Sequence, residues 1–211
     1  MAEDYLTQIK LIQPKGPYNL GGYCMGGTIA YEMSRQLKSA GDDVNILLLL
    51  ETYNACTIEN GNTIINRTKE RLENLKFHFD NIKILKGAER ADFIKIKTET
   101  FLMRSSARMN KIQTKLGLEH KNEQKSGYIS LSLRKINDLA QLKYKPLLLE
   151  CNVVLLKPKI SFSSEPDPKF GWGDFIKGDI KIFNLDVAPR GMLVEPFVKI
   201  TARIIDQELT K

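Results

Sequence analysis

The sequence has few of the residues that build metal sites and disulfide frameworks. Its 211 residues include 3 cysteines and 2 histidines. Cys24, Cys56 and Cys151 are odd in number and unrelated in spacing, which fits neither a set of disulfides nor a zinc site. We therefore expect free thiols in a reducing, cytoplasmic compartment, with no bound metal or cofactor.

Long apolar runs are also absent. The longest aliphatic stretch, residues 46–50, is too short to cross a bilayer, and the first residues lack the basic patch and apolar core of a signal peptide. A membrane is therefore not an expected partner. The length and a hydrophobic content of 42% are enough for one sizeable core, so we expect a single domain over residues 1–211.

The formal charge of +7 is concentrated in the middle of the chain. Residues 66–125 carry 15 basic and 8 acidic side chains. Acids interrupt the lysines and no aromatic ladder accompanies them, which argues against binding to nucleic acid. A solvated helical face is the ordinary explanation for such a run, and an acidic protein partner is the alternative.

Hydrophobic spacing predicts a parallel sheet. Residues 18–23 form an apolar strand, residues 28–39 have helical spacing, and residues 44–50 are a continuous apolar run of the kind buried on both faces of a sheet. Strand, helix and strand with short connections make a βαβ unit. The remaining expected elements are helices at 2–12 (with Tyr5, Ile9 and Ile12 on its apolar stripe), 130–143 and from Pro196 onward, and strands at 150–156 and 179–185.

Residues 66–125 carry only helical signals, with Leu72, Leu75 and Phe79 at helical spacing. We expect them to form a helical lid inserted into a core made of residues 1–65 and 126–211.

The turn after the first strand contains the main candidate for chemistry. Gly22-Tyr23-Cys24-Met25-Gly26 reads G-x-C-x-G, the pattern of a nucleophile held on a sharp turn between strand and helix. A Cβ atom at either glycine is expected to collide with the crossing chain. Glu51 ends the next strand, and functional groups collect at the carboxyl ends of parallel strands. A bare G-x-C-x-G is common by chance, so its context decides.

That context resembles a known family. Residues 12–27, followed by Ile29-Ala30-Tyr31-Glu32-Met33, look like the type I thioesterase domains that end nonribosomal peptide synthetases and polyketide synthases. The resemblance covers nearly the whole chain and continues through Leu47 to Thr52, Phe77 to Asn81, Gly171-Trp172 and Gly191 to Pro196. It implies an α/β-hydrolase fold, with a mostly parallel sheet flanked by helices and an inserted helical lid. It also implies release of an acyl or peptidyl chain from the phosphopantetheine arm of a carrier protein.

The resemblance assigns roles to individual residues. Cys24 occupies the nucleophile position, where most members have serine and a minority cysteine. Glu51 occupies the position of the acid, usually aspartate, which orients the histidine and steadies its imidazolium. The backbone N–H of Met25 is placed to donate to the oxyanion.

Two departures from the family pattern predict weak catalysis. The family's histidine stands two residues before Gly-Met-Leu, and Pro189 occupies that place, followed by Arg190. Members also carry several strands ahead of the helix that opens this chain, with a loop that donates a second oxyanion N–H. Losing one such donor typically costs about 2.7 to 4 kcal/mol of transition-state stabilisation. We expect a truncated fold with the first strands missing, so that strand 18–23 is an exposed edge prone to self-association.

Substitutes for the missing base are few. His78 lies in the lid, where a stand-in base and a histidine on a helix surface are the alternatives. Arg190 either stabilises a Cys24 thiolate or is an ordinary surface arginine. His120 lies in a charged loop and Cys56 in another loop, and neither is an expected participant. Trp172 either lines the acyl channel or packs a loop.

Two hypotheses follow from these residues. In the first, the domain forms an acyl-Cys24 intermediate from a carrier-bound thioester, with an acidic carrier docking on the basic lid. In the second, it is an inactive homologue that binds carrier protein or acyl chain without chemistry. The sequence does not identify the acyl chain or distinguish hydrolysis from cyclisation.

Overall fold

The computed structural model describes residues 1–57, 131–159, 167–187, 191–195 and 197–210, together with single residues between 79 and 105. Contacts divide the chain into two compact units, one made of residues 1–70 and 131–211 and the other of residues 71–130. The described residues of the second unit are all helical. The rest of the predicted lid, residues 66–125, lies outside the described residues.

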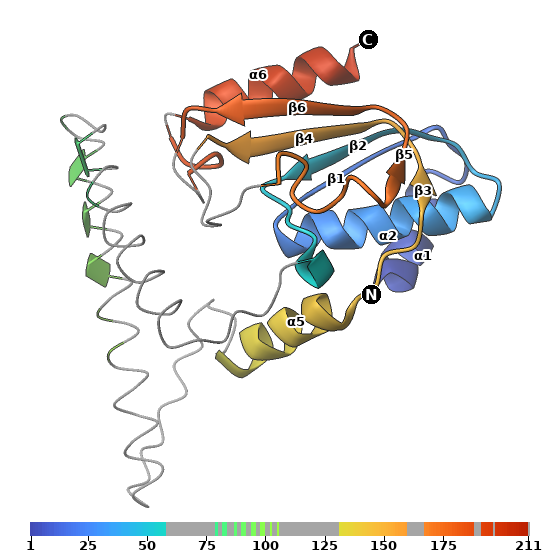
Figure 1. Cartoon of the computed structure of the whole chain (residues 1–211), viewed down its shortest axis with the longest axis horizontal. Coiled ribbons are helices and arrows are strands. Elements are labelled where there is room, and N and C mark those ends of the chain that lie inside the picture. Colours follow the sequence, from blue (N-terminus) through green and yellow to red (C-terminus); the bar gives the residue numbers. More distant parts are fainter. Residues whose placement is uncertain are drawn as a thin grey trace, which may run out of the picture. The chain divides into compact units, whose positions relative to one another are not determined.

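The first unit is built on a parallel sheet of four strands (Figure 1). Its order is β1 (Tyr18–Tyr23), β2 (Val44–Leu50), β4 (Val153–Pro158) and β6 (Ile180–Leu185), and every neighbouring pair is parallel. β1 therefore lies at one edge of this sheet. A separate pair of short parallel strands, β3 (Leu149–Glu150) and β5 (Ile176–Lys177), lies outside it.

Helices cover both faces of the sheet (Figure 1). On one face, α1 (Ala2–Ile12) and α2 (Met25–Ser39) pack against a core that includes Leu47, Leu49 and Leu155. On the other, α6 (Val198–Leu209) packs against a core that includes Leu48, Leu50 and Leu156. Successive residues of β2 thus enter opposite cores, which explains its unbroken apolar run.

Two details differ from the prediction. The expected strand at 150–156 is two strands, because the chain bends at Cys151 and Asn152, so that Glu150 pairs with Lys177 while Val153 joins the main sheet. Apolar content shows that a segment is extended, but not which strand it pairs with.

The expected apolar stripe of α1 is also wrong. The helix buries Leu6, with Ala2 and Ile9 partly buried against the same core, whereas Tyr5 and Ile12 are 50% and 89% exposed. The chain leaves the helix at Gln13, so Ile12 lies beyond the contact with α2.

Two further elements lie outside the sheet. α5 (Leu131–Lys143) leads into the segment before β3, and a short 3-10 helix, η1 (Ala55–Thr57), follows β2. Among the described residues, no helix has both the length and the apolar content needed to span a membrane.

Candidate active site

The turn between β1 and α2 holds Cys24 in an unusual backbone conformation. Its φ is 53° and its ψ −121°, and α2 begins at the next residue, three residues earlier than the spacing predicts. The Cys24 N–H donates to the Leu50 carbonyl at 2.9 Å, and its own carbonyl accepts from Gly27 N–H at 3.0 Å. A non-glycine residue with positive φ is uncommon and tends to mark a functional site. The Cys24 thiol is exposed.

Glycine is required at Gly22 but not at Gly26. A Cβ at Gly22 would overlap the Gly26 carbonyl group and lie 2.5 Å from the Gly27 nitrogen, which no backbone can accommodate. A Cβ at Gly26 would meet nothing within 4 Å, so the steric requirement expected there is wrong. Gly27 has that requirement instead, because its added Cβ would overlap the Thr52 side chain. The requirement at Gly27 was not predicted from the sequence, where the pair Gly26-Gly27 was the only indication of it.

Glu51 leaves the neighbouring strand in a similar conformation. Its φ is 46°, directly after β2, and its N–H donates to the Leu156 carbonyl at 2.8 Å. The side chain is only 4% exposed, and Oε2 accepts a hydrogen bond from the Tyr23 hydroxyl at 3.2 Å. Because Tyr23 pairs with Leu50 in the sheet, Cys24 and Glu51 extend adjacent strands at the same register. The structure thus brings the predicted nucleophile and the predicted acid to the carboxyl ends of two adjacent strands.

A loop beyond β4 braces the segment that follows Glu51. The Trp172 indole N–H donates to the Thr52 carbonyl at 2.9 Å, and the Asn54 side-chain amide donates to the Gly171 carbonyl at 2.8 Å. Trp172 is completely buried, with its ring centroid 4.5 Å from that of Tyr31. Of the two alternatives for Trp172, the structure therefore supports packing of a loop.

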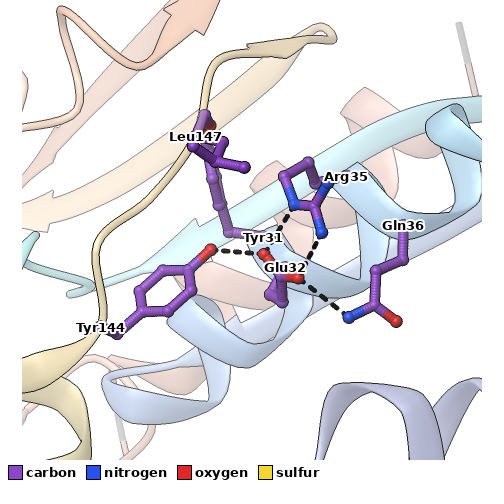
Figure 2. Close-up of polar contacts among 6 residues, drawn as sticks. All are labelled: Tyr31, Glu32, Arg35, Gln36, Tyr144 and Leu147. Atoms are coloured by element: carbon purple, nitrogen blue, oxygen red, sulfur yellow. Dashed lines mark hydrogen bonds and ion pairs between the residues drawn. The ribbon is translucent and has the colours of Figure 1, made fainter.

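The helix that carries Cys24 at its start is held by a polar cluster (Figure 2). The Glu32 carboxylate accepts hydrogen bonds from Arg35, Gln36 and Tyr144, the last with 2.7 Å between Tyr144 Oη and Glu32 Oε2. Burial opposes ionisation of Glu32, but the hydrogen bonds from Arg35, Tyr144 and Gln36 outweigh it and lower its pKa to about 2. The Tyr31 hydroxyl lies 2.8 Å from the Leu147 carbonyl oxygen. α2 is thereby fixed to the segment that follows α5.

Sequence patterns also did not predict a buried lysine near the carboxyl ends of the strands. Lys157, in the last part of β4, is 8% exposed, and its ammonium donates to the Pro168 carbonyl at 2.8 Å and lies 5.0 Å from the centre of the Phe170 ring. Burial lowers the pKa of Lys157, and the charge of Asp167 opposes that effect. A lysine directly after the apolar run Val153 to Leu156 was the available signal. Its contacts fix the loop of residues 167–172.

Several predicted site residues cannot be placed. Pro189, Arg190 and His78 lie outside the described residues, as does His120. Cys56 is exposed in η1, where its N–H donates to the Asn54 side-chain oxygen at 3.3 Å, and Cys151 is buried. In the part of the chain that the structure describes, no group of three or more His, Cys, Asp or Glu side chains could hold a metal ion.

Comparisons with known proteins place the sequence in a family. The family model of the thioesterase domain matches residues 1–143. The dimodular nonribosomal peptide synthase of Bacillus subtilis (strain 168) is 45% identical over 53 residues, which is 25% of this chain and 2% of that protein. Polyketide synthase PksR of the same organism is 48% identical over 61 residues, 28% of this chain and 2% of that protein. The chain therefore spans a small fraction of the length of these curated relatives.

Solved thioesterase domains share the fold. The NocB thioesterase domain from the nocardicin cluster superposes with a TM-score of 0.55 at 20% identity, covering 100% of this chain and 72% of that one. The SrfTE thioesterase domain, which cyclises the lipopeptide surfactin, gives 0.55 at 15% identity and covers 100% and 75%. At these identities the likeness concerns the fold alone, and it confirms the expected parallel sheet flanked by helices of the α/β-hydrolase type. Because the family model matches more than half of its residues, this chain belongs to the thioesterase domain family and is homologous to the thioesterases of nonribosomal peptide and polyketide synthases.

Proposed function

We propose that the domain accepts acyl or peptidyl chains from the phosphopantetheine thioester of a carrier protein, through an acyl-Cys24 intermediate. The observation that carries this proposal is the conformation of Cys24, whose φ is 53° and whose thiol is exposed. Cys24 lies between β1 and α2, and buried Glu51 follows the neighbouring strand β2. Exposure lets a bulky thioester reach the sulfur atom. Strained backbone at a thiol with no packing role is better explained by chemistry than by stability.

The chemistry balances without a cofactor. The Cys24 thiolate attacks the thioester carbonyl carbon, a new carbon–sulfur bond forms, and the pantetheine sulfur leaves with the electron pair and takes a proton from solvent. A thiol needs less help from a base than a hydroxyl in this step, because sulfur is the stronger nucleophile. Water, or a nucleophilic group of the acyl or peptidyl substrate itself, then displaces Cys24.

We propose that one backbone group stabilises the oxyanion. Met25 is the first residue of α2, and the first N–H groups of a helix have no partner within the helix. The adjacent helix N-terminus also favours negative charge. These features support Met25 N–H as an oxyanion donor, with the carbonyl oxygen of the substrate as its acceptor.

Deacylation is the weak step of this proposal. Water must lose a proton as it attacks, and Pro189 stands where the family has histidine. Glu51 would orient that histidine if it were present. We therefore propose fast acylation followed by slow release, with Arg190 and His78 as the residues whose substitution tests for a replacement group.

The second candidate function is binding without chemistry. It is favoured by the same residue, Pro189, because a domain with no base at this place can retain the fold and the docking surface of an enzyme. The two candidates differ in whether a covalent adduct forms on Cys24.

Charge supports the identity of the carrier. Residues 66–125 carry 15 basic and 8 acidic side chains, which suits an acidic carrier protein docking on this segment. A helical lid made of this segment, inserted in the sequence between core residues 1–65 and 126–211, is part of the proposal. The free thiols of the chain suit a reducing, cytoplasmic location.

Self-association through the sheet edge is a further part of the proposal. β1 is an edge strand, and beside it lies a groove of about 470 Å³ lined mainly by apolar residues of α1, β1 and α2. Tyr5, Ile9 and Leu20 are among them. An edge strand next to apolar surface favours pairing with another chain.

Mass spectrometry after incubation with an acyl-pantetheine thioester tests the function. We expect a mass increase of one acyl group that persists in Cys56→Ala and disappears in Cys24→Ala, since Cys56 is the matched exposed thiol. An adduct on neither cysteine at any pH, with carrier protein still bound in a pull-down, would establish the binding-only function. Slow loss of the adduct, accelerated in Pro189→His, would confirm that the base limits release.

A further inference from the structure

Two consecutive residues at the end of β1, Tyr23 and Cys24, contribute side chains to the site. Tyr23 is the last residue of β1 and directly precedes Cys24. Its ring is partly buried against the core that contains Leu48, Leu50 and Leu156. From there the hydroxyl reaches Glu51 Oε2 at 3.2 Å.

Glu51 has physical reasons to need such a donor. Its side chain is 4% exposed, and a buried carboxylate is costly unless hydrogen bonds satisfy its oxygen atoms. Glutamate also has one more rotatable bond than aspartate, so its carboxylate has more positions to occupy. A hydrogen bond from a ring packed against the core restricts those positions, because the ring itself is held by a strand.

We propose that Tyr23 is a positioning residue that holds the Glu51 carboxylate beside the Cys24 turn. The proposal rests on the function proposed for Cys24 and Glu51. The end of β1 then fixes both the Cys24 thiol and the Glu51 carboxylate. The backbone after Tyr23 positions the thiol, and the Tyr23 hydroxyl positions the carboxylate. Any displacement of β1 relative to β2 would move the nucleophile and the holder of the acid together.

A double-mutant cycle on Cys24 reactivity tests this inference without requiring turnover. The rate constant for alkylation by iodoacetamide at pH 7 is measured in a Cys56→Ala background, so that Cys24 is the one exposed thiol among the described residues. Glu51→Gln removes the carboxylate beside the Cys24 turn and is expected to raise the alkylation rate roughly threefold through the loss of its charge. Tyr23→Phe removes the hydrogen bond that holds the Glu51 carboxylate. It is expected to raise the rate roughly twofold, in the same direction, because the released carboxylate no longer stays beside the turn.

The coupling between the two changes is decisive. If Tyr23 acts through Glu51, Tyr23→Phe has no further effect in the Glu51→Gln protein. Tyr18→Phe is the matched control, because Tyr18 lies in the same strand and its hydroxyl donates to the Gln13 carbonyl at 2.9 Å, away from the turn. It should leave the rate unchanged.

Two results would overturn the inference. One is a rate in Tyr23→Phe equal to that in Tyr18→Phe, and the other is an equal effect of Tyr23→Phe with and without Glu51. Thermal unfolding confirms that each variant is folded, and Tyr23→Leu offers a second way to remove the hydroxyl. Failure of the proposed function is separate from both results, since it appears as absence of an acyl adduct while the alkylation cycle still reports the coupling.

Discussion

Cys24 and Glu51 leave adjacent parallel strands at the same register, and both do so with left-handed backbone, at φ values of 53° and 46°. Left-handed backbone is unfavourable for residues with a Cβ, and neither position is glycine. The two residues lie side by side at the carboxyl ends of β1 and β2, where functional groups collect in parallel sheets. The strain is held by the hydrogen bonds that each backbone N–H donates to the next strand.

The glycines of the turn should differ sharply in their tolerance of alanine. Gly22→Ala is expected to destabilise the protein by roughly 1 to 3 kcal/mol or more, because the added methyl overlaps the Gly26 carbonyl group. Gly26→Ala should be neutral or stabilising by up to about 1 kcal/mol, because the site is open and alanine favours a helix. Urea unfolding of the two variants measures both changes. Equal destabilisation would show that the turn has a different geometry.

The Glu32 cluster should make stability depend on acid pH. The pKa of Glu32 is lowered from 4.5 to about 2 in the folded protein, so its contribution is full above about pH 4.5 and is lost as the pH falls toward 2. A shift of this size corresponds to at most about 3 kcal/mol. We expect wild type to exceed Glu32→Gln in stability at pH 7 and to lose that advantage between pH 4.5 and 2, as measured by denaturant unfolding. A constant difference across this range would contradict the assignment.

Lys157 should also make stability rise with pH, but in the alkaline range. Its folded-state pKa lies below the ordinary value of 10.5, so the unfolded chain binds more protons in the interval between the two. The stability of wild type relative to Lys157→Met should therefore rise with pH through that interval. At pH 7 the variant is expected to lie within about 1 kcal/mol of wild type or above it, since burial of the charge is itself unfavourable. Unfolding at pH 7 and pH 10 measures the trend, and a falling difference would refute it.

Trp172→Phe should weaken both stability and chemistry. The change leaves the buried Thr52 carbonyl without its indole donor and opens space beside Tyr31, with an expected loss of about 1 to 3 kcal/mol. The segment after Glu51 loses a brace, so acylation of Cys24 should also slow. Time-resolved mass spectrometry measures the second effect. Unchanged acylation in a destabilised variant would show that Trp172 serves packing alone.

Association should depend on the groove beside β1. Tyr5→Lys places a charge in this groove and is expected to reduce any oligomer, because a buried lysine opposes apolar contact. Leu11→Lys is the matched control, since Leu11 lies on the same helix, is 74% exposed and is not among the residues lining the groove. Sedimentation over a range of concentrations distinguishes them. A wild-type monomer at every concentration would remove this part of the proposal.

The local elements of the first unit could be predicted because they follow from short-range patterns. The strand at Tyr18–Tyr23, the run at Val44–Leu50 and the pairing of Cys24 with Glu51 as candidates all needed only periodicity and the G-x-C-x-G turn. What could not be predicted depends on contacts between distant residues. The requirement at Gly27 comes from Thr52, and the burial of Lys157 comes from Pro168 and Phe170.

The same distinction explains the errors. Spacing on α1 predicted the stripe of Tyr5, Ile9 and Ile12, but the helix buries Leu6 because of where α2 lies. The Tyr23 hydrogen bond to Glu51 has no local signal either, because the two residues are 28 positions apart. Slow release of the acyl group because of Pro189 stays a prediction, and the Pro189→His variant tests it.

The strand order has a consequence for synthesis on the ribosome. β1, α2 and β2 emerge together, but the second edge of β2 pairs with Val153 to Leu156, which are translated about a hundred residues later. Until β4 is made, the backbone N–H and C=O groups on that edge of β2 are unpaired and its apolar side chains are less covered. The nascent chain thus exposes the most apolar part of the domain for several seconds, at about 5 to 20 residues per second. Chaperone capture during translation should therefore center on residues 44–50.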